Sequence, residues 1–551
     1  MTRTQITIVL WNGQKHPPIW PIRFMLLGII WLAATCAEGQ TNYFVASGGS
    51  DASNGTSPAT AWATIHYGAN QLNPGDVLTV QEGTYDGFRM ERSGTISAPI
   101  VIYAQPGDTV ILNHINQISS PRNCIIEIET WSGDGTVSNV VVEGFQVDNS
   151  PRYGIWTLGT AFCVVRGNTV SGSASSGIFT SFSYDLLIED NTSYGNGEHG
   201  IYFNNSGDRF AIRRNMLFGN ANCGLHMNAD ASIIDDPVRD DGMISDGIVE
   251  ANMIYANIAG GSGINMDGVE GAVVRNNLIF STPNNSGIAL FKADGAYASR
   301  NNLILNNTVL MSTTGGWGIN LTAGAVSNRV FNNIIYSAHS WRGAISLASS
   351  AQAGFQSDGN VLENGFSADG GDTKENITTW RARGYDLNST LTASPDLLFE
   401  NVSQTNYHLQ ASSLAIDVAI DLPSVARDRD RVPRPLDGLN NRTARWDAGC
   451  YEFVNATADT DGDAMRDTAE LYAGTNPTNS SDFLAVHITA ASNQVVLTWP
   501  SAEGRSYTIK AISMLGYNGA NLRTNITADP PINSISIDRV QPSVFYSLTV
   551  E

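Results

Sequence analysis

Four residues that can accept or donate a proton lie in the middle of the chain: His199, Tyr202, His226 and Lys292. An imidazole or an amine can act as a general base, and a phenol or an imidazole can donate a proton. Oxygen ligands of the kind that Ca²⁺ prefers lie among them: Asn204, Asn228, Asp230 and Asp267. These residue types fit β-elimination at a uronate, in which a base removes the proton α to a carboxylate that Ca²⁺ or arginine neutralises. Lys292 or His226 would be the base, and Tyr202 or His199 the proton donor.

Residues that could hold a sugar ring accompany this group: Trp156, Phe179, Tyr202 and Asn265. Aromatic rings that point away from a core are costly to expose and stack well on sugars, so we expect them to bind substrate. A terminal loop that covers the aromatic rings is the structural alternative.

Two other functions stay open. Glycoside hydrolysis needs two carboxylates, and Asp267 could pair with Asp230, Asp240 or Asp241. The last two belong to an insertion, Asp230 to Asp246, which also holds Asp235 and Asp236 and could form a wall beside the site. The third function is non-catalytic glycan binding or a surface role. A C5-epimerase is disfavoured because the chain has no Asp-Pro-His-Asp sequence.

A repeated phrase places these residues on one surface. It begins at eight positions, mostly 23 or 24 residues apart: Gly154, Gly177, Gly200, Gly224, Gly263, Gly287, Gly318 and Ala344. In each repeat an apolar residue follows, and a second inward residue comes two positions later, as in Ile201 and Phe203. Because side chains alternate along a strand, Trp156, Phe179, Tyr202, His226 and Asn265 then point outward in one column. Short strands with a fixed period predict a solenoid, here a right-handed parallel β-helix.

A second column of asparagines keeps the same step: Asn168, Asn191, Asn215, Asn252, Asn277, Asn307 and Asn333. We expect these side chains to bond amide to amide from coil to coil, which makes the column structural.

Composition and the N-terminal segment limit the classes of protein to which this chain can belong. The 551 residues carry a net charge of −21, which disfavours nucleic acid and anionic membranes as partners. Residues 1–39 contain an apolar run, Phe24 to Thr35, followed by small residues, which predicts a signal peptide and no stable membrane span afterwards. We therefore expect a secreted or cell-surface protein, and we expect it to be a monomer.

 Of the five cysteines, Cys163 falls on the inward phase and is expected in the core.

The N-terminal segment predicts a cap for the first coil. Tyr43 to Asp51 reads as a strand and a turn, a short amphipathic helix follows around Ile65, Ala69 and Leu72, and Val77 to Val80 reads as a strand. This stretch resembles the N-terminal cap of secreted bacterial β-helix proteins of the chondroitinase-B-like and alginate-lyase-like group, which have a pectin-lyase-like fold. The resemblance implies a polysaccharide substrate, and with the mixture of bases and Ca²⁺ ligands it favours a lyase acting on an anionic, uronate-containing glycan.

Carboxylates after the solenoid have the spacing of a Ca²⁺ loop: Asp459, Asp461, Asp463, Asp467 and Glu470. The segment resembles thrombospondin type 3 or dockerin-like repeats, which implies structural Ca²⁺. Ala464 stands where such loops usually have glycine.

Alternating segments from Phe483 onward predict a small fibronectin-III-like β-sandwich. The expected division is a signal peptide at 1–39, a β-helix at 40–455, a Ca²⁺ loop and linker at 456–481, and a sandwich at 482–551.

Overall fold

The computed structural model describes residues 40–115, 122–130, 136–233, 240–258, 260–491, 494–512, 520–538 and 545–550. The predicted signal peptide, together with Asp235 and Asp236, lies outside these residues. The described chain forms two compact units. The β-helix unit runs to Arg431 and includes 446–452, and the C-terminal unit comprises 432–445 and the chain from Phe453 onward.

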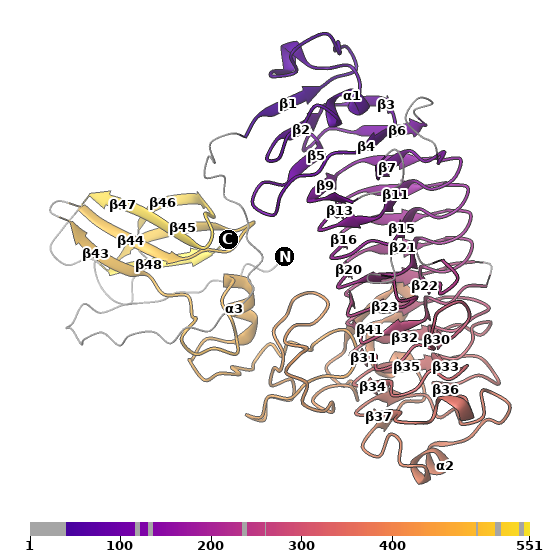
Figure 1. The fold of residues 1–551 in the computed structure, drawn as a ribbon. Helices are drawn as coiled ribbons and strands as arrows, with labels where there is room; N and C mark the ends of the chain where they lie inside the picture. The colour runs from indigo at the N-terminus through magenta and orange to yellow at the C-terminus, as the bar shows by residue number, and fades with distance from the viewer. Residues whose placement is uncertain are drawn as a thin grey trace. The chain divides into compact units, whose positions relative to one another are not determined.

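The β-helix unit contains three long parallel sheets, which Figure 1 shows as successive coils. Sheet A is formed by β1 (Asn42–Val45), β2 (Val77–Val80), β5 (Ile100–Ala104), β9 (Val140–Glu143), β13 (Val164–Arg166), β16 (Leu187–Glu189), β20 (Ala211–Arg213), β24 (Ile248–Glu250), β28 (Val273–Arg275), β31 (Leu303–Leu305), β34 (Arg329–Phe331) and β37 (Gln356–Asp358). Sheet B is formed by β3 (Gly83–Asp86), β6 (Val110–His114), β10 (Gln146–Asp148), β14 (Thr169–Ser171), β17 (Thr192–Tyr194), β21 (Met216–Phe218), β25 (Met253–Tyr255), β29 (Leu278–Phe280), β32 (Thr308–Met311), β35 (Ile334–Ser337), β38 (Val361–Leu362) and β40 (Thr390–Leu391). Sheet C is formed by β4 (Phe88–Met90), β7 (Ile126–Ile128), β11 (Ile155–Leu158), β15 (Ile178–Ser181), β18 (Ile201–Asn205), β22 (Leu225–Ala229), β26 (Ile264–Asp267), β30 (Ile288–Phe291), β33 (Ile319–Leu321), β36 (Ile345–Leu347) and β39 (Phe366–Ser367).

Shorter strands lie where sheet C turns toward sheet A. β8 (Val137–Ser138) pairs with β12 (Thr160–Ala161), and β23 (Ile244–Ser245) lies between β19 (Gly207–Asp208) and β27 (Val269–Glu270). Further along, β41 (Phe399–Asn401) and β42 (Asn406–Leu409) form an antiparallel pair.

The repeat glycines of sheet C are needed because successive coils approach closely. A Cβ atom on Gly200 would lie 2.8 Å from the carbonyl oxygen of Gly224 in the next coil. The predicted strand phase is confirmed: Ile201, Phe203 and Leu225 are buried, and Ile201 pairs in register with Leu225. Cys163 is buried in the core, as predicted.

The asparagine column forms the predicted ladder. Each Nδ2 donates to the Oδ1 of the asparagine in the next coil, at 2.9–3.1 Å, from Asn168 through Asn333 and on to Asn360. Most of these side chains also donate to a backbone carbonyl, as Asn191 does to Val165 at 2.9 Å. A buried amide is costly unless it is bonded, so the ladder satisfies its own polar groups while it fixes the turn between sheets A and B.

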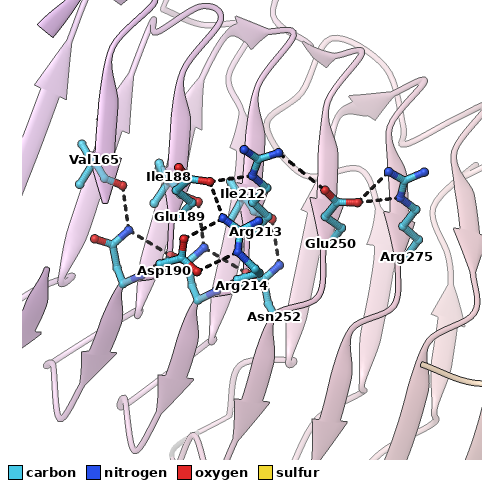
Figure 2. Close-up of polar contacts among 12 residues, drawn as sticks. Val165, Ile188, Glu189, Asp190, Ile212, Arg213, Arg214, Glu250, Asn252 and Arg275 are labelled. Carbon is cyan, nitrogen blue, oxygen red and sulfur yellow. Dashed lines mark hydrogen bonds and ion pairs between the residues drawn. The ribbon is translucent and has the colours of Figure 1, made fainter. Parts of the chain in front are cut away.

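Charges alternate along the outer face of sheet A. Glu143, Arg166, Glu189, Arg213, Glu250 and Arg275 occupy matching positions on successive strands. Figure 2 shows Glu189 beside Arg213 and Arg214, with N–O distances of 2.8 and 2.6 Å, and Glu250 beside Arg275 at 2.7 Å. Alternation of opposite charges in register stabilises the pairing and leaves this face with little net charge.

The first coil is capped as predicted. Thr64 caps the N-terminus of helix α1 (Ile65–Ala69), because its side chain accepts from the backbone N–H of Tyr67. Ile65, Ala69 and Leu72 are buried. At the other end, helix α2 (Ile377–Ala382) places Trp380 in the core. None of the described helices is long and apolar enough to cross a membrane.

The C-terminal unit contains helix α3 (Asp467–Ala473) and two small antiparallel sheets. One sheet has the order β43 (His487–Ala491), β44 (Gln494–Pro500), β47 (Ile532–Asp538), and the other β46 (Ala520–Thr527), β45 (Ser506–Ile512), β48 (Phe545–Val550). Ala473 joins their hydrophobic core, against which Met465 and Tyr472 also pack. The acidic loop and the strands therefore share one core, while the four-part division drawn from the sequence stays a prediction.

Candidate active site on sheet C

The outward column of sheet C has the predicted register. Trp156 pairs with Phe179, Phe179 with Tyr202, Tyr202 with His226, and His226 with Asn265. Two residues further along each strand, Asn204, Asn228 and Asp267 also stand side by side. The coils therefore bring together residues that are up to 63 positions apart in the sequence, as counted from Asn204 to Asp267.

The two aromatic residues at the N-terminal end of the column are covered. Trp156 and Phe179 are only 7% and 6% exposed, and they form a cluster with Tyr153 and Cys124. The Tyr153 ring stacks on Phe179 with centroids 4.2 Å apart. The expectation of open ring faces at Trp156 and Phe179 is therefore corrected, because turn residues fold back over them; a sugar-binding role for these two residues stays a prediction.

The next residues form a half-buried cluster of proton-carrying side chains, which we call the His–Tyr cluster: His199, Tyr202 and His226. The two imidazole rings stack, with centroids 4.5 Å apart and an interplanar angle of 15°. The Tyr202 ring lies 5.0 Å from that of His199 and 4.8 Å from that of His226. Tyr202 and His226 come from β18 and β22, and His199 from the turn before β18.

Burial sets the protonation states of the cluster. It lowers the pKa of His199 to about 4 and, together with the neighbouring His199, that of His226 to about 3. Burial also raises the pKa of the Tyr202 phenol. At neutral pH both imidazoles are therefore uncharged and the phenol holds its proton.

Hydrogen bonds distinguish the two histidines. The Nδ1 of His199 accepts from the backbone N–H of Cys223 at 3.2 Å, so its proton resides on Nε2 and it can donate outward. The Nδ1 of His226 lies 3.9 Å from the Cys223 thiol sulfur. When this Nδ1 carries the ring proton and donates to the sulfur, Nε2 of His226 is free to accept a proton, which makes His226 the candidate base and Tyr202 the candidate proton donor.

Three predicted site residues are engaged elsewhere. Asp267 is fully buried, and its two carboxylate oxygens accept from the backbone N–H groups of Ala293 and Asp294, both at 2.8 Å. Lys292 is exposed and donates to the carbonyl of Ala296 in its own loop, at 2.9 Å. The carboxylate of Asp230 accepts from the backbone and the hydroxyl of Ser232. Asp267 therefore anchors the loop that carries Lys292.

These contacts bear on the calcium site predicted for sheet C. Asn228 and Asp267 are buried, and the Asp267 oxygens already hold a loop. Within the described ranges, the acidic, histidine and cysteine ligands that gather around one point are Asp459, Asp461 and Asp463, and none belongs to sheet C. The calcium site on sheet C therefore stays a prediction, and no step below depends on it.

Sequence reasoning missed residues at the N-terminal end of the column. Arg89 and Glu127 continue it beyond Trp156, in register. The guanidinium groups of Arg122 and Arg152 both lie 5.1 Å from the Trp156 ring centroid. The alternation in Ile126, Glu127 and Ile128 was a usable signal for β7, but no glycine precedes it at the repeat position. The two arginines come from turns, which the repeat does not predict.

The acidic loop of the C-terminal unit has the features of a cation site. Besides the three gathered aspartates, both carboxylate oxygens of the fully buried Glu470 lack a hydrogen-bond partner, as does one oxygen each of Asp461 and Asp463. Burial, followed by the nearby aspartates, raises the pKa of Glu470 to about 8. Asp467 instead accepts from the backbone and hydroxyl of Thr460 at 2.8 and 2.7 Å.

Comparison with known proteins agrees with this fold. The family described as "Right handed beta helix region" matches residues 95–236. Among solved structures, pectate lyase Pel9A has 13% identity and a TM-score of 0.50, over 75% of this chain and 96% of that one. An alginate lyase from Paenibacillus sp. str. FPU-7 has 16% identity and a TM-score of 0.34, over 48% and 90% of the two chains. The Azotobacter vinelandii mannuronan C-5 epimerase AlgE4 A-module has 14% identity and a TM-score of 0.37, over 60% and 91%. No curated protein matched the sequence.

The chain is therefore a right-handed parallel β-helix protein with a pectin-lyase-like fold. At an identity this low, the similarity to Pel9A establishes only the fold, and the reaction has to be inferred from the chemistry of the site.

Proposed function

We propose that the protein is a secreted polysaccharide lyase that cleaves an anionic, uronate-containing glycan by β-elimination at the His–Tyr cluster. The observation that carries this proposal is the stacking of two uncharged imidazoles beside a protonated phenol, on the outer face of sheet C. Elimination needs one group to take a proton and another to give one, and the cluster supplies both. The fold also serves a pectate lyase, which is compatible with a polysaccharide substrate.

In this mechanism His226 removes the proton α to the uronate carboxylate, and Tyr202 protonates the leaving oxygen. An imidazole with a pKa of about 3 is a weak base in the free protein. A bound uronate would place a negative charge nearby, which favours imidazolium and raises the pKa of His226 when it is needed. His199 donates from Nε2 to the uronate carboxylate, which orients the sugar and takes up part of the charge that a cation would otherwise neutralise. Asn204, Asn228 and Asn265 contribute hydrogen bonds to hydroxyl groups.

Electrophoresis through native gels that contain polygalacturonate or alginate tests substrate binding. We expect the polymer to retard the wild-type protein and not to retard the double variant His199→Ala/His226→Ala. The exposed Trp341 lies elsewhere on the β-helix unit, and Trp341→Ala is the control. Equal migration with and without each polymer for the folded wild type would count against the proposal. Binding without turnover would favour the non-catalytic alternative.

We also propose that the acidic loop binds one structural Ca²⁺. The unbonded oxygens of Asp461, Asp463 and Glu470 support this, because carboxylates without hydrogen-bond partners are what a hard cation requires. Asp459 completes the group. Asp467 positions the loop through Thr460 rather than as a ligand, a change from the set expected from spacing.

Calorimetric titration of the full-length protein with Ca²⁺ tests this second proposal. One site is expected, lost in Asp461→Ala and kept in Asp529→Asn, an exposed carboxylate of the same unit. A titration that shows no heat and no change in melting would reduce the loop to an acidic linker.

A further inference from the structure

A hollow lies on the β-helix unit, at the corner where the chain passes from sheet C to sheet A. It has a volume of about 470 Å³ and is lined by residues of four successive coils, including Asn139, Phe162, Tyr184, Asp185, Asp208 and Arg209. None of these residues belongs to the His–Tyr cluster. We propose that this hollow is a second glycan-binding site and that it takes an uncharged pyranose ring.

Phe162 provides the stacking surface. Its side chain is 49% exposed, although it is the largest apolar side chain of the hollow. Its backbone has a φ of 55°, as have Asn139 and Arg209 in equivalent turns of other coils. Asparagine tolerates this left-handed conformation, whereas a bulky residue there is uncommon. Because the Phe162 ring is exposed to solvent, it contributes little burial to the stability of the fold. It leaves a ring face open for stacking on the apolar face of a sugar.

Polar groups for the sugar hydroxyls surround this ring. Arg209 donates from Nε and Nη2 to the two carboxylate oxygens of Asp185, both at 2.8 Å, which holds both groups in one plane. The remaining guanidinium donors and carboxylate lone pairs are available to a pair of neighbouring hydroxyls. Asp208 accepts from the backbone N–H of Ser245 at 3.1 Å, which fixes the carboxyl group at the edge of the hollow.

Charge selects an uncharged sugar. Among the described residues that line the hollow, Arg209 is the one cation, and it faces Asp185 and Asp208, with Asp246 also close. A uronate or a sulfated sugar would meet a net negative potential here. The two sites therefore differ in ligand: the His–Tyr cluster is proposed to take uronates, and this hollow takes uncharged residues of a polysaccharide.

Saturation-transfer NMR and fluorescence titration of the full-length protein test this inference with cellohexaose, xylohexaose and mannohexaose. We expect at least one of them to bind, and Phe162→Asn to weaken that affinity by about tenfold or more, since one stacked ring is lost. This variant should fold, because Asn139 has the same φ in the equivalent turn. Trp341→Ala, which removes another exposed aromatic ring, should bind as the wild type does.

Two results would overturn the inference: no binding of any of the three hexasaccharides, or equal affinity in the wild type and Phe162→Asn. Hexagalacturonate is titrated in parallel and reports on the His–Tyr cluster. If the wild-type protein binds an uncharged hexasaccharide but not hexagalacturonate, only the proposed lyase function is contradicted. If it binds hexagalacturonate but none of the uncharged hexasaccharides, only the second site is contradicted.

Discussion

His199 and His226 make the β-helix unit sensitive to acid. Their folded pKa values, about 4 and about 3, lie below the ordinary value of 6.5 because both half-buried rings are partly desolvated and, for His226, because His199 lies beside it. The unfolded chain therefore binds more protons between pH 6.5 and pH 3, so this contribution to stability is complete above pH 6.5 and is lost as the pH falls. We expect His226→Gln to flatten the decrease in Tm between pH 6.5 and pH 4. An identical pH profile in the variant would mean that His226 is open to solvent.

Glu470 has the opposite pH dependence. Its folded pKa of about 8 lies above the ordinary value of 4.5, so in the absence of a cation its contribution to stability is complete below pH 4.5 and is lost as the pH rises through 8. Ca²⁺ should displace the proton, and its stabilising effect on the C-terminal unit should therefore grow from pH 6 to pH 8. Melting curves with Ca²⁺ or a chelator measure this effect. In Glu470→Gln, Ca²⁺ should raise the Tm far less, and an undiminished rise would contradict the assignment.

The asparagine ladder is the element on which coil stacking depends most directly. Asn252 donates to Asn277 and to the carbonyl of Ile212, and its Oδ1 accepts from Asn215. Asn252→Ala leaves several buried polar groups unpaired, which should cost about 1–3 kcal/mol for each unsatisfied group. A urea titration followed by circular dichroism measures the loss. Asn222→Ala, a half-buried position outside the ladder, is the control and should unfold near the wild-type midpoint.

The elements that could be predicted from the sequence are those that repeat. The strand register of sheet C follows from the spacing of Gly200 and Gly224, because each coil imposes the same approach on the next. The covering of Trp156 by Tyr153 could not be predicted, since it depends on how a turn folds back over the sheet. The role of Asp267 was also hidden, because its partners are backbone N–H groups that carry no sequence signal.

At the scale of the whole molecule, a net charge of −21 opposes the binding of an anionic polymer. On sheet A the alternation of Glu189 and Arg213 neutralises the outer face, so this charge lies elsewhere. Salt screens such repulsion, because the Debye length falls from about 30 Å at about 0.01 M salt to about 8 Å at about 0.15 M. We therefore expect uronate binding to be stronger at the higher salt concentration. Retardation in polygalacturonate gels at the two salt concentrations measures this effect, and weaker binding at the higher concentration would point to a cationic groove instead.

The most direct test of the proposed lyase function is the ultraviolet absorbance of an unsaturated uronate, recorded while the full-length protein acts on polygalacturonate, alginate and chondroitin. We expect absorbance to increase with at least one polymer, and Tyr202→Phe and His226→Ala each to lower the rate by about 10²-fold or more, since each removes a proton-transfer group. Both variants should keep the wild-type circular dichroism spectrum, because the outer positions of sheet C contribute little to the core. New reducing ends without absorbance would contradict elimination and indicate hydrolysis.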